Sequence, residues 1–314
     1  MQSNGREDPA LTATVTRRVP LWYADGADPA FDRPPHVRAA SGVVGYGREL
    51  AVVQDDALFL AFADPATGLC RGVPLPCEDG VRLFDAGRRN KMRKPDLEAV
   101  IRLDDLLVGF GSGSAAGRDR LILARGDFTR WFDGSELYAA LAANQAFAGS
   151  ELNVEGVAVV GDAIRLFNRG NGRQIGEIMP GDATCDVDLG AFLGWLDGGP
   201  VPAIRDIVRW DLGFMDGVRL TFTDATATGE GGVLFLAAAE ASPNAVDDGV
   251  VVGAAVGRLG DGGWCRITED GAPLLDKVEG IALDPADPGR AWVVVDRDDP
   301  DLPAALLELR LGGF

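Results

Sequence analysis

Short phrases that contain a carboxylate recur along this chain, and they are its first candidates for chemistry. The phrase VEGV at 154–157 returns as VEGI at 278–281, and LEAV at 97–100 is a third version. Looser copies carry Ser41 and Asp216 at the corresponding position. If the fold brings these positions together, the carboxylates need a cation, a neighbouring arginine or lysine, or protonation to offset their repulsion.

Two interpretations of the carboxylates stay open. Calcium prefers oxygen ligands, and it would find them in one set of side chains: Asn153, Glu155, Asn168, Glu279 and Asp296. Alternatively, each glutamate caps backbone N–H groups or pairs with an arginine of the next repeat. A zinc site of histidine and cysteine is excluded, because His36 is the only histidine and the four cysteines form no CxxC pair.

Basic residues cluster beside the same phrases. The chain has only three lysines, Lys91, Lys94 and Lys277, and each falls just before a recurring glutamate. Lysine carries a compact charge that pairs with buried carboxylates. With these lysines, five further side chains would form a rim suited to a small anionic ligand such as a carboxylate or phosphate ester: Arg118, Arg120, Arg169, Asn171 and Arg297. A purely structural set of salt bridges is the competing interpretation.

The spacing of the phrases predicts the elements that position them. Their second residues stand at 41, 98, 155, 216 and 279, a regular spacing of about 60 residues that is typical of β-propeller blades. The 42 glycines and 18 prolines suit short strands joined by tight turns. The only helix we expect lies around 137–143. We therefore expect an all-β propeller of five blades, with six as the alternative if 197–209 holds irregular strands.

The two ends of the chain are expected to meet. The last repeat ends after its third strand at Leu311, and a strand-like segment at 12–16 precedes the first repeat. We predict that this N-terminal strand, within residues 1–40, supplies the outer strand of the last blade and closes the ring. The whole of 1–314 would then be one propeller domain.

The repeats also predict where the side chains gather. Each recurring phrase opens a first strand, and a polar cluster ends each second strand, at 54–56, 111–114, 168–171, 240–242 and 296–299. In an antiparallel hairpin these two places lie at the same end. The sequence therefore predicts a site at one mouth of the central channel.

Charge and targeting signals exclude several classes of function. A net charge of −18 repels nucleic acid and anionic lipid, so neither is expected as a partner. The N-terminus shows no signal-peptide pattern, and no apolar run could cross a bilayer. We expect free cysteines, a cytoplasmic location and a monomer.

Several motifs together resemble a family. They are PDLEA at 95–99, GSGS with RDR at 111–120, NVEG at 153–156, NRGN at 168–171 and DRDDPD at 296–301. With them the sequence resembles a largely uncharacterised bacterial propeller family related to esterase-like phytase domains. Related propellers include calcium-dependent lactonases, phosphoesterases and phytases. The resemblance implies a metal at the channel mouth, with Glu155, Asn168 and Glu279 among its ligands.

These observations lead to a leading hypothesis and its alternatives. The first is a calcium-dependent hydrolase acting on a small anionic ester, lactone or phosphoester, with Glu98, Glu155, Lys94 and Lys277 as catalytic groups. Since His36 lies in a proline-rich segment, the base would be a carboxylate, and lysine or arginine would stabilise the developing anion. The alternative is a noncatalytic module that binds a small molecule or a peptide. A third interpretation is a ring of salt bridges that only clamps the blades.

Overall fold

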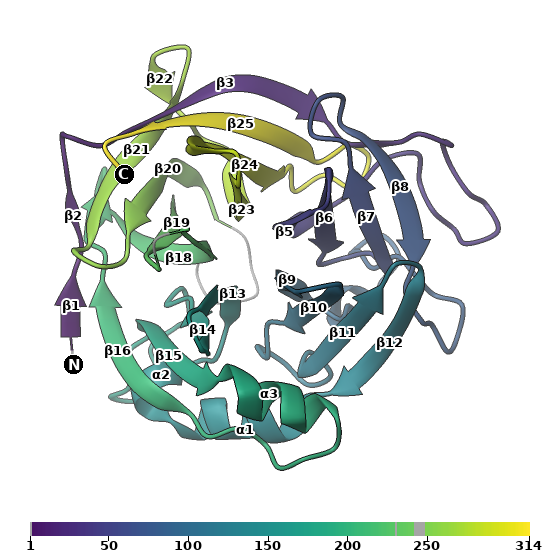
Figure 1. Ribbon diagram of the computed structural model, residues 1–314, viewed down its shortest axis with the longest axis horizontal. Coiled ribbons are helices and arrows are strands. Elements are labelled where there is room, and N and C mark those ends of the chain that lie inside the picture. The colour runs from purple at the N-terminus through teal and green to yellow at the C-terminus, as the bar shows by residue number, and fades with distance from the viewer. Residues whose placement is uncertain (1, 230, 242–248) are drawn as a thin grey trace.

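The computed structural model describes residues 2–229, 231–241 and 249–314, and its sheets are arranged around a common centre (Figure 1). Of the polar clusters expected at the mouth, Ser242 lies outside the described residues. Most of the chain is β-strand, with short helices on one side of the ring. This arrangement is a β-propeller, as the repeat predicted.

Three of the sheets follow the chain as meanders. The first has the order β4–β8–β7–β6–β5, formed by Trp22–Tyr23, Leu69–Pro74, Phe59–Ala63, Glu49–Gln54 and Ala40–Tyr46. The second has the order β12–β11–β10–β9, formed by Phe128–Asp133, Arg120–Arg125, Leu106–Gly111 and Leu97–Leu103. The third has the order β1–β16–β15–β14–β13, formed by Gln2–Asn4, Arg205–Asp211, Asp182–Asp188, Ala163–Asn168 and Val154–Val160.

The remaining strands form one continuous 11-stranded sheet. One part contains β17 Phe214–Met215, β18 Val218–Ala227, β19 Val233–Glu240, β20 Val251–Arg258 and β21 Gly263–Glu269, with β2 Arg6–Glu7 and β22 Ala272–Pro273 beside β21. The other part contains β3 Thr12–Pro20, β25 Ala305–Gly312, β24 Asp287–Asp296 and β23 Lys277–Asp284.

The N-terminal strand β3 lies against the C-terminal strand β25. The two pair antiparallel from Ala305 opposite Pro20 to Gly312 opposite Thr12. On its other edge β3 pairs parallel with β21, where Ile267 lies opposite Ala13. The segment expected to be a strand at 12–16 is therefore part of a longer one, and both ends of the chain share a sheet (Figure 1).

The helices pack on the outer side of the third sheet. α1 (Ser135–Ala143) contains the predicted helix, and α2 (Gln145–Ala148) follows it directly. α3 (Leu189–Leu196) was not predicted. At the N-terminus of α3, the Asp188 side chain accepts a hydrogen bond from the N–H of Ala191. The α3 side chains Phe192 and Trp195 are buried. The stretch 197–209 holds only the start of β16.

Each inner strand contains a β-bulge, and in four of the five strands the bulged residue is the one that recurs in the sequence. The bulges fall at Ser41, Glu98, Glu155, Thr223 and Glu279. A bulge leaves one residue outside the ladder and redirects its side chain. The fold thus presents these five side chains at equivalent places.

Asp216 was expected in this set, and that expectation is wrong. Its phrase forms the turn between β17 and β18, where Asp216 has a φ of 51° and Gly217 a φ of 83°. The side chain is exposed and pairs with Arg266 at 2.8 Å. The equivalent position is Thr223, further along β18.

The glycine after two of the bulged glutamates allows neighbouring inner strands to approach closely. A Cβ added to Gly280 would lie 2.8 Å from the backbone N of Val43, and one added to Gly156 would lie 3.0 Å from the N of Ala225. A Cβ atom at either position would be too close to the neighbouring backbone. The glutamate of each Glu-Gly pair turns its carboxylate out of the ladder at the bulge, and the glycine lets the next inner strand pack against it.

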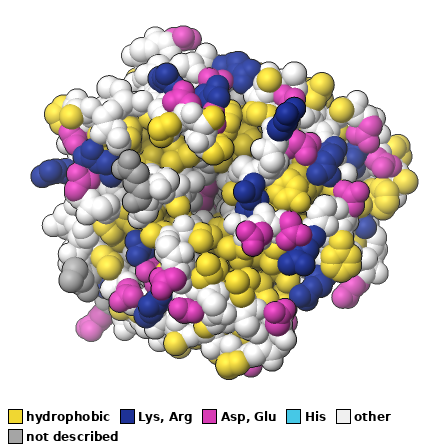
Figure 2. Space-filling view, in the orientation of Figure 1, with side chains coloured by type: hydrophobic (Ala, Val, Ile, Leu, Met, Phe, Trp, Pro, Cys, Tyr) yellow, Lys and Arg dark blue, Asp and Glu magenta, His cyan; other side chains and the backbone are white. Residues whose placement is uncertain are grey.

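The remaining sequence expectations concern single residues. All four cysteines are unpaired. His36 is buried, with Nε2 3.1 Å from the carbonyl oxygen of Pro300, a structural contact. No helix within the described residues is long and apolar enough to span a membrane. On the face shown in Figure 2, acidic and basic side chains are interspersed without a broad area of one sign.

Candidate functional site

A cavity of about 340 Å³ lies where the inner strands begin and the second strands end. Its wall includes the bulged residues Ser41, Glu98, Glu155 and Glu279 and residues that follow β6, β14 and β24. Eleven acidic side chains line it: Asp55, Asp56, Asp85, Asp96, Glu98, Glu155, Glu240, Glu279, Asp296, Asp298 and Asp299. Six basic ones accompany them: Arg38, Lys91, Lys94, Arg118, Arg169 and Lys277. The cavity is of a size that holds a small molecule.

All three lysines of the chain line this cavity. Lys91 belongs to a 3₁₀ turn at Lys91–Arg93, Lys94 ends that turn, and Lys277 opens β23. In a protein whose other basic residues are all arginine, this placement concentrates the compact ammonium groups at one site.

On one side of the cavity, Lys94 joins two carboxylates. Its Nζ lies 2.5 Å from Oδ2 of Asp55 and 2.7 Å from Oδ1 of Asp96. Arg118 then holds the other oxygen of Asp96, donating from Nη1 to Oδ2 at 2.8 Å. The Ser112 hydroxyl also donates to that oxygen. Asp96 is thus surrounded by donors: an ammonium, a guanidinium and a hydroxyl.

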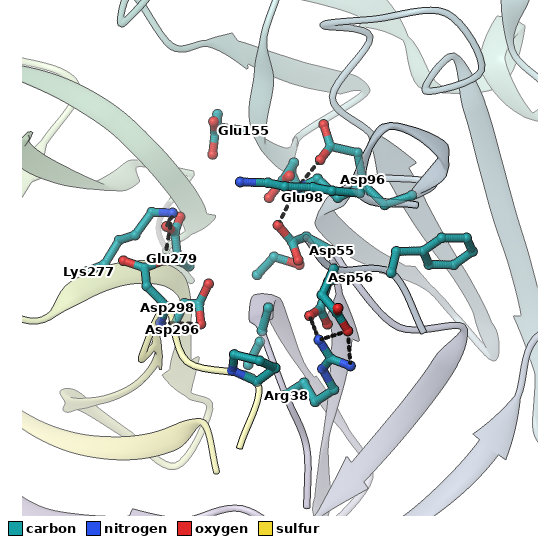
Figure 3. Close-up of a pocket in the computed structure, with 18 of the residues that line it drawn as sticks. Arg38, Asp55, Asp56, Asp96, Glu98, Glu155, Lys277, Glu279, Asp296 and Asp298 are labelled. Carbon is teal, nitrogen blue, oxygen red and sulfur yellow. Dashed lines mark hydrogen bonds and ion pairs between the residues drawn. The ribbon is translucent and has the colours of Figure 1, made fainter. Parts of the chain in front are cut away.

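Glu98 lies close to Asp55 and Asp96 but, unlike them, is not held by a basic side chain among the described residues. Ligand atoms of Asp55, Asp96 and Glu98 lie within 4.8 Å of one another. Only 9% of Glu98 is exposed, and within the described part of the chain its carboxylate has no hydrogen-bond or ion-pair partner. Figure 3 shows Glu98 beside Asp96 and Asp55, facing the open space.

The environments of Glu98 and Asp96 shift their acidities in opposite directions. Burial, and next to it the charges of Asp96 and Glu155, raise the pKa of Glu98 well above its usual range. Burial also opposes ionisation of Asp96, but Lys94 and Arg118 outweigh it and lower the pKa of that carboxyl. A carboxyl that keeps its proton therefore stands next to one that stays ionised.

On another side of the cavity, Arg169 connects two glutamates. Its Nη2 lies 2.6 Å from Oε2 of Glu240, and its Nη1 lies 3.5 Å from Oε1 of Glu155. Asn153 donates from Nδ2 to the same Glu155 oxygen at 2.6 Å and to Oδ1 of Asn171 at 3.2 Å. Burial raises the pKa of Glu155, which Arg169 partly offsets.

The last part of the wall combines Lys277 with the carboxylates that follow β24. Lys277 Nζ lies 3.3 Å from Oε1 of Glu279 and 3.5 Å from Oδ1 of Asp298. Burial raises the pKa of Asp296 to about 7, with Lys277 opposing the shift. Across the cavity, burial and the charge of Asp55 raise the pKa of Asp56 to about 7, although Arg38 lies 2.6 Å away.

Most side chains predicted from the sequence meet at this cavity. They are Lys94, Glu98, Arg118, Asn153, Glu155, Arg169, Asn171, Lys277, Glu279 and Asp296. Arg120 and Arg297 do not: both are exposed and lie outside its wall. Asn168 is fully buried away from it, where its Oδ1 accepts from the N–H of Asn153 and its Nδ2 donates to the carbonyl of Gly181.

Sequence reasoning missed part of the wall. Asp55, Asp56 and Glu240 were recognised only as members of the strand-end clusters, which was the signal that could have found them. Asp96 has a φ of 57°, a conformation in which aspartate is more common than most residues, directly before the bulged Glu98. Arg38 had no comparable signal.

The calcium ligands expected from the sequence do not gather around one point. Asn168 is absent from the wall, and Glu155 and Glu279 each already face a basic side chain. Within the described residues, the acidic group with the spacing that a metal ion requires is Asp55, Asp96 and Glu98. Its oxygen donors suit a hard cation. However, Lys94 already contacts two of its three carboxylates, so the group does not fit a metal while that ammonium is present.

Comparisons with known proteins give a family and distant structural similarities. A family model described as a family of unknown function (DUF6929) matches residues 36–311. No curated protein matches the sequence.

Three solved structures illustrate the structural similarity. A luciferin-regenerating enzyme is 11% identical over 89% of this chain and 94% of its own, with a TM-score of 0.44. A gluconolactonase from Xanthomonas campestris is 12% identical over 95% and 98%, with a TM-score of 0.41. A streptogramin B lyase is 10% identical over 96% and 98%, with a TM-score of 0.40. Identity this low says nothing about chemistry.

Proposed function

The chain belongs to the family of unknown function (DUF6929), and because that description assigns no activity, we propose from the cavity that it is a hydrolase of a small ester or lactone. The observation that carries the proposal is Glu98, a buried carboxyl with a raised pKa and no bonded partner among the described residues, beside Asp96 with a lowered pKa. Titratable groups whose pKa values are pushed apart in a cavity are the usual components of acid–base catalysis.

The proposed reaction needs one acid, one base and a cation. A water molecule gives a proton to Oδ1 of Asp55, an oxygen without a hydrogen-bond partner in the described part of the chain, as it attacks the carbonyl carbon. The ammonium of Lys277 stabilises the negative charge that develops on the carbonyl oxygen. Glu98 then gives its proton to the departing oxygen, so that one ester bond breaks and an acid and an alcohol form. Asp55 returns its proton to Glu98 through solvent.

The charge of the wall supports a substrate class. Eleven acidic and six basic side chains line the cavity. Even with Glu98 protonated, ten acidic side chains face six basic ones, and those that are ionised repel a strongly anionic group. The sequence suggested a small anionic ester, lactone or phosphoester, but the charge of the wall leads us to favour a neutral ester or lactone. An anionic substrate would bind where Arg169 and Lys277 lie.

Calcium would enter this proposal at one place. It would be held by Asp55, Asp96 and Glu98 only if it displaced the ammonium of Lys94. Calcium dependence of turnover, measured after treatment with a chelator, tests that version of the hypothesis.

We also propose that the propeller has five blades closed by the N-terminal strand. The supporting observation is that a bulged inner strand opens each of five meanders, the last of which is completed by β3. A sixth blade would need an additional meander in 197–209, and that stretch contains only the start of β16.

A screen with two matched variants tests the hydrolase. The native chain is assayed against neutral esters, lactones and phosphoesters, with the Glu98→Gln and Glu49→Gln variants beside it. Glu49 is partly exposed and begins β6, at the end of the strand away from Asp55. Removing its charge should therefore leave turnover unchanged. We expect Glu98→Gln to lower kcat by 100-fold or more, about what a general acid supplies. Full activity of Glu98→Gln would reject the role of Glu98.

A noncatalytic binding module is the second candidate. The ion pairs of Lys94, Arg169 and Lys277 hold most of the wall in fixed positions, as a recognition site requires. Saturable binding of a small molecule or peptide, with no product formed by the native chain, would favour this candidate. If mutations of the wall lowered only the melting temperature, the salt bridges would serve the fold alone.

A further inference from the structure

Lys94 occupies an unusual position among acidic side chains. It contacts Asp55 at 2.5 Å and Asp96 at 2.7 Å, and these two carboxylates form with Glu98 the acidic group that has metal-ligand spacing. Only 11% of the Lys94 side chain is exposed. Its charged end is therefore held between carboxylates rather than in solvent, which is unusual for lysine.

The charges of this group are nearly balanced without a metal ion. With all three carboxyls ionised the charge is −3, and Lys94 with Arg118, which bonds Asp96, contributes +2. The sum is −1, and it is 0 while Glu98 keeps its proton. A divalent cation added to the native group would make it positive in either case and would face the Lys94 ammonium within a few ångströms. Without Lys94, and with Glu98 giving up its proton to the ion, the sum would be −2, which a divalent cation neutralises.

We propose that the Lys94 ammonium is a built-in cation that takes the place of a divalent metal between Asp55, Asp96 and Glu98. The native protein is then independent of metal at this site, and loss of the Lys94 amine turns the group into a site for a hard divalent cation such as Ca²⁺ or Mn²⁺. The donors are oxygen atoms only, which selects such ions over softer ones. This inference does not depend on catalysis.

The backbone supports a permanent role for the lysine. Lys94 is the residue at which the 3₁₀ turn Lys91–Arg93 ends, and its N–H bonds back to the carbonyl of Lys91. Two residues later, Asp96 turns the chain into β9 with a positive φ. The ammonium and one of its carboxylates are thus fixed to the same short segment, three residues long from Lys94 to Asp96.

The test compares the native chain with Lys94→Met, which keeps the length of the side chain and removes its charge. Both are treated with a chelator, and melting is followed with and without millimolar Ca²⁺ or Mn²⁺. We expect no shift for the native chain and a rise of about 5 °C for Lys94→Met, because an ion that binds only the native state stabilises it by mass action. Calorimetric titration and elemental analysis should find one ion per chain in the variant alone.

Lys277→Met is the matched control. Lys277 is also a cavity lysine and contacts the carboxylates of Glu279 and Asp298, but neither belongs to a group with metal-ligand spacing among the residues that the structure describes. We expect no ion to bind this variant. An equal gain of affinity in Lys277→Met would show a general effect of charge and overturn the proposal.

Two further results would overturn it. Saturable binding of calcium to the chelator-treated native chain is the first, and it does not require any variant to fold. A folded Lys94→Met that binds neither ion is the second. Lys94→Arg keeps the charge and should behave as the native chain does. None of these readouts uses turnover, so they separate this inference from the fate of the proposed hydrolase.

Discussion

Arg169 and Glu240 join two sheets through a buried ion pair. Arg169 follows β14 in the third sheet, Glu240 ends β19 in the 11-stranded sheet, and the two are 2.6 Å apart. Their side chains are 4% and 3% exposed. Arg169 also contacts Glu155, so one guanidinium offsets the charge of two largely buried glutamates in the cavity wall.

Replacing Arg169 with methionine should therefore be strongly destabilising. The change removes the guanidinium that lies beside the buried Glu155 and Glu240, and breaking one partner of a buried pair typically costs about 3–5 kcal/mol. The free energy of unfolding from denaturant titration measures it. The control is Arg173→Met, because Arg173 pairs with Glu151 with 69% of its side chain exposed and should lose less than about 1 kcal/mol. Equal effects of the two changes would contradict the importance of burial.

Asp296 should make the protein less stable as the pH rises from about 4 to 7. Burial raises its pKa from 3.8 to about 7, so between these values the folded state holds a proton that the unfolded state has released. Stability falls with pH wherever the folded state binds more protons, and it levels off above the folded pKa.

The Asp296→Asn variant has no such proton to lose. Its free energy of unfolding relative to the native chain should rise by roughly 1–3 kcal/mol between pH 4 and 7. Denaturant titrations at several pH values check this, with Asp299→Asn on the same exposed loop as the control. A difference that stays constant across the range would show that Asp296 is not held in its protonated form.

The proposed hydrolase should lose activity on the alkaline side. Turnover requires the proton of Glu98, whose pKa is raised well above its usual range, so kcat/KM should fall as the pH passes through that raised value. Among the neighbouring charges, Lys94 lowers this pKa. The alkaline limit should consequently move to higher pH in Lys94→Met. If the alkaline limit stays in place or moves to lower pH in Lys94→Met, the loss of activity at high pH belongs to a group other than Glu98.

The recurring phrases predicted the inner strands well because the phrase and the bulge have a common cause. Glu155 and Glu279 leave the ladder at a bulge, and the glycine after each permits close contact between inner strands. The glutamate occupies the bulge, and the close strand contact requires the glycine. Because these two residues are adjacent, they form a short phrase that can be recognised in the sequence. Asp216 shows the limit of the method: its phrase has similar letters, but a residue with positive φ followed by glycine forms a turn.

The side chains that complete the site could not be predicted in the same way. Lys94 contacts Asp55 and Asp96, and Arg118 contacts Asp96. These side chains come from three segments, and which atoms come within 3 Å is set by how the inner strands pack around the centre. Neither Arg120 nor Arg297 can be told from Arg118 by composition. What separates them is the direction in which each side chain leaves its loop, a property of the folded chain.

Gly280 should not tolerate a side chain. A Cβ there would lie 2.8 Å from the backbone N of Val43 and equally close to the side chain of Val294, so Gly280→Ala forces the inner strands apart. Overpacking of this kind costs about 1–3 kcal/mol. Gly45→Ala in β5 has open space around its Cβ and is the control. Thermal melting compares the two, and a Gly280→Ala variant as stable as Gly45→Ala would contradict the close approach.

Deleting residues 2–20 should disrupt the protein far more than deleting residues 2–8. The shorter deletion removes only β1 and β2, which pair over three and two residues. The longer one also removes β3, which pairs with β25 along its length and with β21 on its other edge, so two strand edges would lose their partners. Unpaired edges lead to aggregation.

We therefore expect the longer deletion to aggregate or to melt well below the native chain, and the shorter one to remain close to it. Adding a separate peptide of residues 9–21 to the longer deletion should restore part of its stability, because the missing strand can then pair as before. Similar melting of both deletions, measured by circular dichroism and light scattering, would show that β3 does not hold the two ends together.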